Sequence, residues 1–421
     1  MLSGSQGAFL KDKTAMMSSI KRVSTLLFGV AVLLTGHGLQ LALVPLRAES
    51  MGWSSIAIGV LGSVYFSGFL IGCFVIPRLV ERIGHIRTFA ALTALMTSVV
   101  LSLALFSDFL FWLILRFLTG IAISGLYLVI ESWLNQQTEN DVRGSVLATY
   151  IAIVLAALAL GQLLINTIPV NDERLIIVAS ILIGLAAIPV CVSRKVQPAQ
   201  IPTAVFSPLL VLKTSKVAAI GALISGIVTG SFYSLGPVYG LDIGMDIPGI
   251  SIMMAFGIAG GAFSQLPLGR LSDTKDRRVV ILYVMLAGTV SAGLAWIVPL
   301  VFIPYAMLLF GACVMPIYAL SLAHASDNIR TESFLEVGTG LLMTNAVGSI
   351  IGPLLTAQAM QWFGAEYFFS SNAVVLLIGA IAVAILVRFH KSDRKHFTEF
   401  ELATTASAQG RIQMDPRSEP E

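Results

Sequence analysis

The sequence predicts an all-α integral membrane protein, with twelve transmembrane helices in two pseudo-symmetric six-helix bundles. Composition, long apolar runs and an internal repeat lead to this fold class. Of the 421 residues, 56% are hydrophobic and 12% are charged, whereas about a quarter of the residues of an ordinary soluble protein are charged. A soluble globule needs a largely polar outer layer, so the apolar excess argues against one. The net charge of +3 is too small to indicate a nucleic-acid-binding protein.

Apolar runs of about twenty residues recur between short polar breaks, and each is long enough to cross the ~30 Å hydrocarbon layer as a helix. Helix is the expected conformation because backbone groups in lipid must be satisfied within their own segment. Strands of an outer-membrane barrel would be shorter and would alternate in polarity. The predicted spans are 23–44, 54–77, 88–106, 109–134, 144–168, 174–193, 217–240, 249–269, 279–298, 300–323, 334–360 and 366–389.

The distribution of basic residues predicts the orientation. Outside the predicted spans or at their ends, 23 Lys and Arg residues fall on one side of the membrane, and only Arg47 and Arg174 fall on the other. Loops rich in Lys and Arg stay in the cytoplasm. Both termini are therefore predicted to be cytoplasmic, in a multi-pass protein of the cytoplasmic (inner) membrane.

The polar breaks also divide the chain into segments. A Pro-containing basic stretch, the longest internal break, separates the two halves. The polar ends, residues 1–20 and 390–421, are expected to be disordered because they lack apolar periodicity. The predicted organisation is a cytoplasmic N-terminal segment (1–22), a first bundle (23–193), a cytoplasmic linker (194–216), a second bundle (217–389) and a cytoplasmic tail (390–421).

The two halves repeat each other. A shift of about 192 positions places the stretch 77–81 on 269–273, Gly120 near Gly311, and Gly161 near Gly352. Two six-helix halves of this kind recur in transporters, where the substrate site lies at the interface of the repeats near the membrane midplane.

The stretch Gly269-Arg270-Leu271-Ser272-Asp273-Thr274-Lys275-Asp276-Arg277-Arg278 resembles the signature Gly-x-x-x-Asp-x-x-Gly-Arg-Arg of the major facilitator superfamily. Asp276 stands where a glycine is usual. The first copy is looser, with Pro77 and Glu81 in place of the glycine and the acid, Gly84 kept, and His85 and Arg87 at basic positions. Arg116-Phe117-Leu118-Thr119-Gly120 is similar to a fourth-helix signature of the same family. The resemblance covers residues 22–389.

This resemblance implies a secondary active transporter that moves a small solute by alternating access. The Gly-Pro pair of the superfamily's antiporters is absent at Gly161-Gln162 and occurs instead at Gly352-Pro353, which weakens the case for proton-coupled drug efflux. A poorly characterised bacterial branch fits best. Substrate, direction and coupling ion stay open, protons included. The alternative is a membrane-embedded sensor or an uncoupled facilitator.

Charged residues of the signature loops are predicted to form a cytoplasmic gate. An acid on such a turn can accept hydrogen bonds from the N-terminus of a neighbouring helix. The basic residues beside it can pair with Glu139, Asp141, Glu332 or Glu336. These charges could also serve only to fix the topology. The predicted gate consists of Glu81, Arg82, Gly84, Arg87, Gly269, Asp273, Arg277, Arg278, Glu332 and Glu336.

Polar residues inside the spans are candidates for a substrate or coupling cavity, because such residues are costly in a membrane. Arg116 is predicted to face this cavity, and Tyr127 and Glu131 share its helix face. The alternatives are that Arg116 and His37 fix helix packing, and that Asn345 lies in a packing seam. The candidates are Arg116, His37, Gln40, Tyr127, Glu131, Asn345 and Tyr65.

The sequence contains no phosphate-binding loop Gly-x-x-x-x-Gly-Lys-[Ser/Thr], no His-Glu-x-x-His and no Cys-x-x-Cys. Cys73, Cys191 and Cys313 lie in apolar runs without metal-ligand spacing. We therefore expect no catalytic residues, metal or cofactor. The expected partners are a small-molecule substrate and the lipid bilayer, with the chain acting as a monomer and not as an enzyme.

Overall fold

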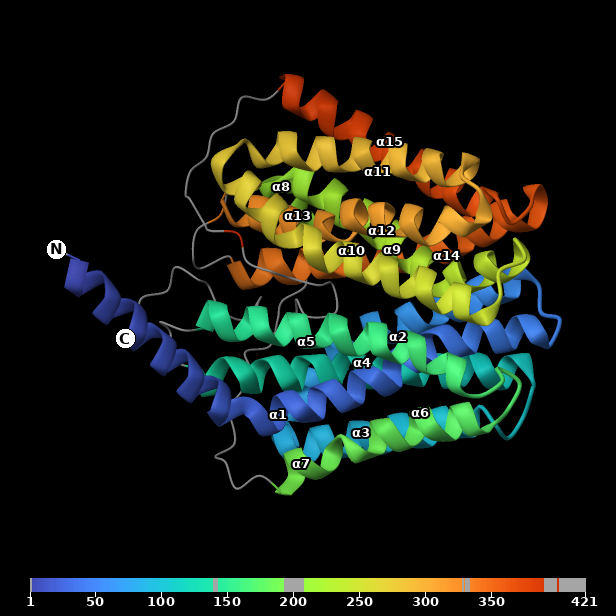
Figure 1. Ribbon diagram of the computed structural model, residues 1–421, viewed down its shortest axis with the longest axis horizontal. Coiled ribbons are helices and arrows are strands. Elements are labelled where there is room, and N and C mark those ends of the chain that lie inside the picture. The colour runs from blue at the N-terminus through green and yellow to red at the C-terminus, as the bar shows by residue number, and fades with distance from the viewer. Residues whose placement is uncertain are drawn as a thin grey trace.

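The computed structural model describes residues 2–138, 143–192, 208–327, 329, 334–389 and 400, and the described part is helical without strands. Figure 1 shows that most helices run along the long axis of the molecule. The helices of the first half are α1 (Leu2–Ser50), α2 (Ser55–Ile83), α3 (His85–Ser102), α4 (Phe109–Gln137), α5 (Arg143–Leu164), the short 3-10 helix η2 (Ile165–Thr167), α6 (Arg174–Leu185) and α7 (Ala187–Val192). Then follow α8 (Pro208–Thr214), α9 (Lys216–Asp242), α10 (Ile247–Thr274), α11 (Arg277–Ile297), η3 (Leu300–Phe302), α12 (Ile303–Val314), α13 (Pro316–Ser326), α14 (Phe334–Phe363) and α15 (Tyr367–Phe389).

Within these residues, twelve helical segments are long and apolar enough to cross a membrane, which confirms the predicted fold class. Short polar side chains fix where several spans begin. Ser54 accepts a hydrogen bond from the backbone N–H of Ala57 at the start of α2, and Asp108 does the same for Phe111 in α4. Such N-caps satisfy backbone donors that have no partner within the helix.

The first helix is longer than predicted. Residues 2–22, most of which we expected to be disordered, continue α1, and its other end extends to Ser50. No glycine or proline interrupts residues 8–28, so nothing in that stretch ends the helix. At the far end, Arg47 is buried together with its apolar neighbours. A long basic side chain can cover apolar surface in this way, and its charge therefore does not mark a helix end.

Two spans are broken by prolines. The sixth span consists of α6 and α7, with Pro189 just after the break, and the tenth consists of α12 and α13, with Pro316 as the first residue of α13. Proline lacks the backbone N–H and clashes with the preceding turn, so the helix is interrupted at both places.

Helices α1–α7 form one bundle and α9–α15 form the other (Figure 1). Residues 194–207 of the predicted linker lie outside the described residues. The rest of it contains α8, whose Val211 is buried in a cluster with Ala218 and Leu341. This helix was missed from the sequence because a single apolar turn among polar residues gives little periodic signal.

Close backbone contacts at glycines hold neighbouring helices together. A Cβ atom on Gly68 would collide with the carbonyl oxygen of Phe117, and one on Gly120 would collide with that of Tyr65. Both contacts join α2 to α4. Only glycine lets two helix backbones approach so closely.

The same contacts recur in the second half. A Cβ atom on Gly260 would meet the carbonyl oxygen of Leu308, and one on Gly311 would meet that of Gly257, which joins α10 to α12. These positions are those of the first half shifted by about 192 residues. The repeat seen in the sequence is therefore a repeat of helix crossings, and the pseudo-symmetry of the two bundles is confirmed.

The bundles meet at the end opposite the N-terminus of α1. There the Ser63 hydroxyl of α2 donates to the carbonyl oxygen of Ile350 in α14 (2.6 Å), and the Asn166 amide donates to the Ser251 hydroxyl (2.7 Å). A Cβ atom on Gly59 would lie 2.6 Å from Cβ of Ala357. We call this contact region the seal.

We predict that Gly120→Ala lowers the apparent melting temperature of the purified protein, because α2 and α4 must separate to admit the methyl group. Overpacking of this kind costs about 1–3 kcal/mol. Gly293→Ala is the matched control, because nothing lies within 4 Å of its Cβ position. Thermal unfolding in detergent should show no loss for Gly293→Ala, and equal losses for the two variants would contradict the proposed role of the crossing.

Candidate functional site: a cavity between the two bundles

A cavity of about 90 Å³ lies between the bundles. Both halves supply its walls. No Asp, Glu, Lys or Arg is among the residues that line it, which are His37, Leu41, Tyr65, Phe66, Phe69, Tyr127, Val154, Leu155, Leu158, Thr229, Tyr233, Gln265, Met315, Leu342, Asn345, Ala346 and Ser349.

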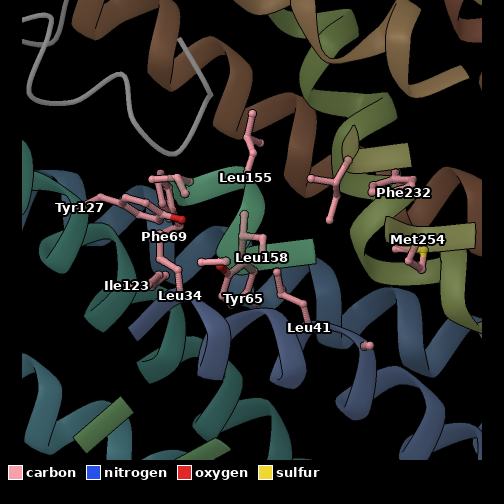
Figure 2. Close-up of a cluster of buried hydrophobic side chains, with 14 of the residues drawn as sticks. Leu34, Leu41, Tyr65, Phe69, Ile123, Tyr127, Leu155, Leu158, Phe232 and Met254 are labelled. Atoms are coloured by element: carbon pink, nitrogen blue, oxygen red, sulfur yellow. The ribbon is translucent and has the colours of Figure 1, made fainter. Parts of the chain in front are cut away.

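The two walls differ in chemistry. The first bundle contributes mainly aromatic and aliphatic side chains from α2, α4 and α5, and Figure 2 shows Tyr65, Phe69, Tyr127, Leu155 and Leu158 gathered there. The second bundle contributes two amides, two aliphatic hydroxyls and one tyrosine beside its apolar residues. These five side chains are Gln265, Asn345, Thr229, Ser349 and Tyr233.

A chain of polar contacts leads from the cavity into the first bundle. The His37 ring joins Gln40 Oε1 through Nδ1 (3.3 Å) and Tyr65 Oη through Nε2 (3.2 Å). The amide oxygen only accepts, so Nδ1 carries the proton and the Tyr65 hydroxyl donates to Nε2. The guanidinium carbon of Arg116 lies 4.4 Å from the centroid of the Tyr65 ring, a cation–π distance.

The structure places Arg116 differently from the prediction. The residue is 5% exposed and is not among those that line the cavity. Tyr65 lines the cavity, and the guanidinium of Arg116 packs on the Tyr65 ring. Nε and Nη1 of Arg116 have no hydrogen-bond partner among the described residues. The spacing of polar residues in the sequence predicts which face of a helix is polar. It does not predict that an aromatic side chain of a neighbouring helix, here Tyr65, covers a residue on that face.

The other candidates separate into two groups. His37, Tyr65, Tyr127 and Asn345 line the cavity. Asn345 also donates through Nδ2 to the carbonyl oxygen of Ala222 (3.0 Å), so it links α14 to α9 as well.

Gln40 and Glu131 do not line the cavity. Gln40 lines a separate, much smaller cavity beside Arg47 and Trp112. Glu131 is buried, and the Tyr150 hydroxyl donates to its Oε1 (3.1 Å). Both residues therefore reach the central cavity only through neighbours, if they act on it.

Several lining residues were missed from the sequence. Gln265 is the clearest case, since it is 1% exposed and its Oε1 has no hydrogen-bond partner among the described residues. An amide inside an apolar run is itself a signal of a cavity or a polar contact. Thr229 and Ser349 gave no such signal, because Ser and Thr in a helix usually bond to their own backbone, as these two residues do. Tyr233 was also missed from the sequence.

The second signature loop forms a charged cluster at the end of α10. Arg277 pairs with Asp273 (2.9 Å) and with Asp327 of α13 (2.9 Å), and Arg277 and Asp327 are each 1% exposed at the side chain. The Arg277 Nε–H is not aligned with Asp327 Oδ2, so this contact is an ion pair rather than a hydrogen bond. The backbone N–H of Phe400 donates to Asp273 Oδ1 (2.9 Å), and its ring packs where a Cβ of Gly269 would lie. Phe400 is thus placed within the tail that we expected to be disordered, whose other residues lie outside the described part.

Asp276, which stands where the family signature has a glycine, caps a helix in this structure. Its side chain accepts from the backbone N–H of Arg278 and caps α11, and it pairs with the Arg278 guanidinium (2.8 Å). Burial raises the pKa of the Asp276 carboxyl, but the hydrogen bonds from Arg278 outweigh it and lower the pKa below the ordinary value. In the first copy, Gly84 instead ends α2 with a φ of 82°, a conformation that favours glycine.

The remaining gate candidates make no described ion pair. Glu81, Arg82 and Arg87 are exposed. Glu332, Glu139 and Asp141 lie outside the described residues. Glu336 makes no ion pair with a described residue. The described partners of Arg277 are Asp273 and Asp327, and Asp327 was not among the partners expected from the sequence.

Residues 26–339 match the Major Facilitator Superfamily. The chain belongs to this superfamily. It is therefore a multi-pass membrane transporter with a small-molecule substrate rather than an enzyme.

Named relatives agree with this assignment. The chain is 28% identical to an uncharacterized MFS-type transporter of Enterobacter sp. (strain 638) over 390 residues, which cover 91% of this chain and 99% of the relative. It is 27% identical to the uncharacterized MFS-type transporter YcaD of Escherichia fergusonii over 374 residues, covering 88% and 96%. The poorly characterised branch expected from the sequence is thereby confirmed.

Solved structures share the fold. The nucleoside transporter NupG matches with a TM-score of 0.74 at 12% identity, covering 88% of this chain and 100% of its own. A bacterial homologue of the human lysosomal transporter Spinster, in an inward-facing and unoccupied conformation, matches with a TM-score of 0.67 at 13% identity, covering 94% and 97%. At these identities the likeness concerns the fold of the superfamily.

We predict that the Arg116–Tyr65 contact stabilises the first bundle through the ring rather than the hydroxyl. Tyr65→Phe loses the hydrogen bond to His37 but keeps the ring, so it should lower the apparent melting temperature less than Tyr65→Leu, which also loses a desolvated cation–π contact of about 2 kcal/mol. In an Arg116→Met background, the Tyr65→Leu change should cost less. Additive losses in this double-mutant cycle would mean that the two residues stabilise the protein independently.

We also predict that Asp327→Asn destabilises the protein more than Asp273→Asn. Removing one partner of a buried ion pair costs about 3–5 kcal/mol, and Asp327 is buried while the Asp273 side chain is 23% exposed. Monodisperse yield and apparent melting temperature give the comparison. Asp273→Asn should stay folded and insert normally. Equal losses in both variants would contradict a buried pairing at Asp327.

Proposed function

We propose that this protein is a secondary active transporter of the cytoplasmic (inner) membrane, which moves its solute through the central cavity by alternating access. One observation carries the proposal. The cavity lies between two pseudo-symmetric bundles, is lined by both, and lies beside the seal at the end opposite the N-terminus of α1. Rocking of one bundle against the other would open the seal and expose the same cavity to the other side.

The arrangement corresponds to an inward-facing state if both termini are cytoplasmic, as the basic loops predict. The seal residues Ser63 and Ile350 then lie on the outer side. They join the halves through a side-chain-to-backbone hydrogen bond, the Asn166–Ser251 hydrogen bond adds a second link, and Gly59 packs closely against Ala357. These contacts would be exchanged in a two-state transition, in which each hydrogen bond contributes about 1 kcal/mol net.

The charged cluster at Arg277 would act on the same transition from the cytoplasmic side. Its two described ion pairs, with Asp273 and Asp327, lie within the second bundle. They would keep the end of α10 rigid against α13, so that the bundle moves as one body. This is a more local role than the links between halves suggested by the sequence.

Proton coupling, where it occurs, would use Glu131 or His37. Both are buried in spans and can gain or lose a proton, whereas Arg116 cannot do so in practice. Glu131 is linked to α5 through Tyr150, and α5 also lines the cavity. A change in the charge of Glu131 would therefore be felt in the cavity wall.

The proposal is tested by labelling a single cysteine in the cavity. Ser349→Cys, in a variant without the three native cysteines, should react with a membrane-impermeant maleimide from either side of sealed vesicles, because the cavity opens to each side in turn. A sensor that holds one conformation would be labelled from one side only, which would contradict alternating access.

Gly59→Leu in the same background should raise labelling from the seal side severalfold and lower it from the other. The added side chain collides with Ala357 and Pro353 and prevents closure. Gly293→Leu is the control, with open space around its Cβ position, and should leave both rates unchanged.

A further inference from the structure

We propose that the carried solute is a small uncharged molecule with one flat ring and an amide-like polar group, bound with its ring on the first bundle and its polar group against Gln265 and Asn345. This inference rests on the proposed transport function and specifies its substrate class.

The charge of the solute is inferred from the residues that line the cavity. No Asp, Glu, Lys or Arg lines the cavity, and both ring nitrogens of His37, the one histidine in the lining, are hydrogen-bonded, to Gln40 and Tyr65. A charged solute would leave water for a site without a counter-ion, which is strongly unfavourable. Arg116, the nearest candidate for an anion, lies against the ring of Tyr65 and does not line the cavity. The lining therefore favours an uncharged solute.

The polar group follows from Gln265. Its side chain is nine-tenths or more buried and belongs to the cavity wall, yet its Oε1 has no hydrogen-bond partner among the described residues. A buried acceptor without a donor is costly, so an N–H or O–H of the solute would satisfy it. Asn345 uses Nδ2 for the carbonyl oxygen of Ala222, which leaves its Oδ1 as a second acceptor.

The ring follows from the opposite wall. Tyr65, Phe66, Phe69 and Tyr127 all line the cavity from the first bundle. Aromatic side chains in such number favour a flat apolar partner. The volume of about 90 Å³ is smaller than the about 150 Å³ that holds benzene in an engineered cavity. Lining side chains such as Met315 and Leu342 must shift for a ring to enter, and the site suits one ring rather than a peptide or an oligosaccharide.

Thermal stabilisation of the purified full-length protein tests the inference with two matched series. One consists of benzamide, benzoate and benzylamine, and the other of nicotinamide, nicotinate and 3-(aminomethyl)pyridine. Each series keeps the ring and replaces the neutral amide by an anionic carboxylate or a cationic aminomethyl group. The neutral amides should raise the apparent melting temperature in a saturable way, and the charged members should not. Stabilisation by a charged member alone, or by none of the six, overturns the proposal.

Gln265→Leu locates the binding. It should weaken the affinity for the amides about tenfold, as expected for the loss of one good hydrogen bond. The melting temperature without ligand should stay equal or rise, since the variant removes a buried acceptor that has no described partner. A merely structural glutamine would show the reverse pattern, with lower stability and unchanged affinity.

Gln162→Leu is the matched control. Gln162 is also buried, and neither of its amide atoms has a partner among the described residues, but it does not line the cavity. Its affinity for the amides should match that of the unmodified protein. A loss equal to that of Gln265→Leu would place the binding elsewhere.

Flux of the same six compounds in proteoliposomes separates the two proposals. Binding of the amides without flux would contradict the transport function and leave the site chemistry standing. Flux of the charged members alone would support transport and overturn the uncharged substrate.

Discussion

Contact between helix backbones at glycines is the interaction on which the rest of this structure depends. In lipid there is no water to drive helices together, so association relies on close packing. Gly68 and Gly120 bring α2 onto α4, and Gly260 and Gly311 bring α10 onto α12 in the same way. Each bundle is thus tightly joined within itself. Between the bundles, the Ser63–Ile350 hydrogen bond and the close approach of Gly59 to Ala357 belong to the seal, and residues of both bundles line the cavity.

The two halves share their crossings but not their chemistry. Arg277 of the second half, paired with two aspartates, corresponds to His85 of the first, whose ring nitrogen bonds the Ser132 hydroxyl. The cavity walls differ likewise, with aromatic residues on one side and amides on the other. Repetition therefore supplies a pair of similar rigid bodies. Divergence of side chains at equivalent positions supplies an asymmetric site, which a small asymmetric solute requires.

The sequence was sufficient for the fold because the spans and the repeat are carried by local composition and by glycines at nearly constant offset. The site was only partly predictable. His37, Tyr65, Tyr127 and Asn345 line the cavity as residues of polar character inside spans. The placement of Arg116 could not be predicted, because the ring that covers it comes from another helix. The pairing of Arg277 with Asp327 joins residues fifty positions apart, which no helical period relates.

The Arg116 guanidinium and the Glu131 carboxylate of the first bundle are buried and do not line the cavity. Arg116 lies behind Tyr65 of the cavity wall, and Glu131 accepts a hydrogen bond from Tyr150 of α5, a helix that lines the cavity. A guanidinium or carboxylate in the wall would have to be desolvated again whenever the cavity closes, at a cost of several kcal/mol. Tyr65 contacts the guanidinium through its ring and Tyr150 contacts the carboxylate through its hydroxyl, and neither charged group lines the cavity. The charges can then influence the solute and the helix packing through the tyrosines, while the surface that opens and closes stays easy to bury.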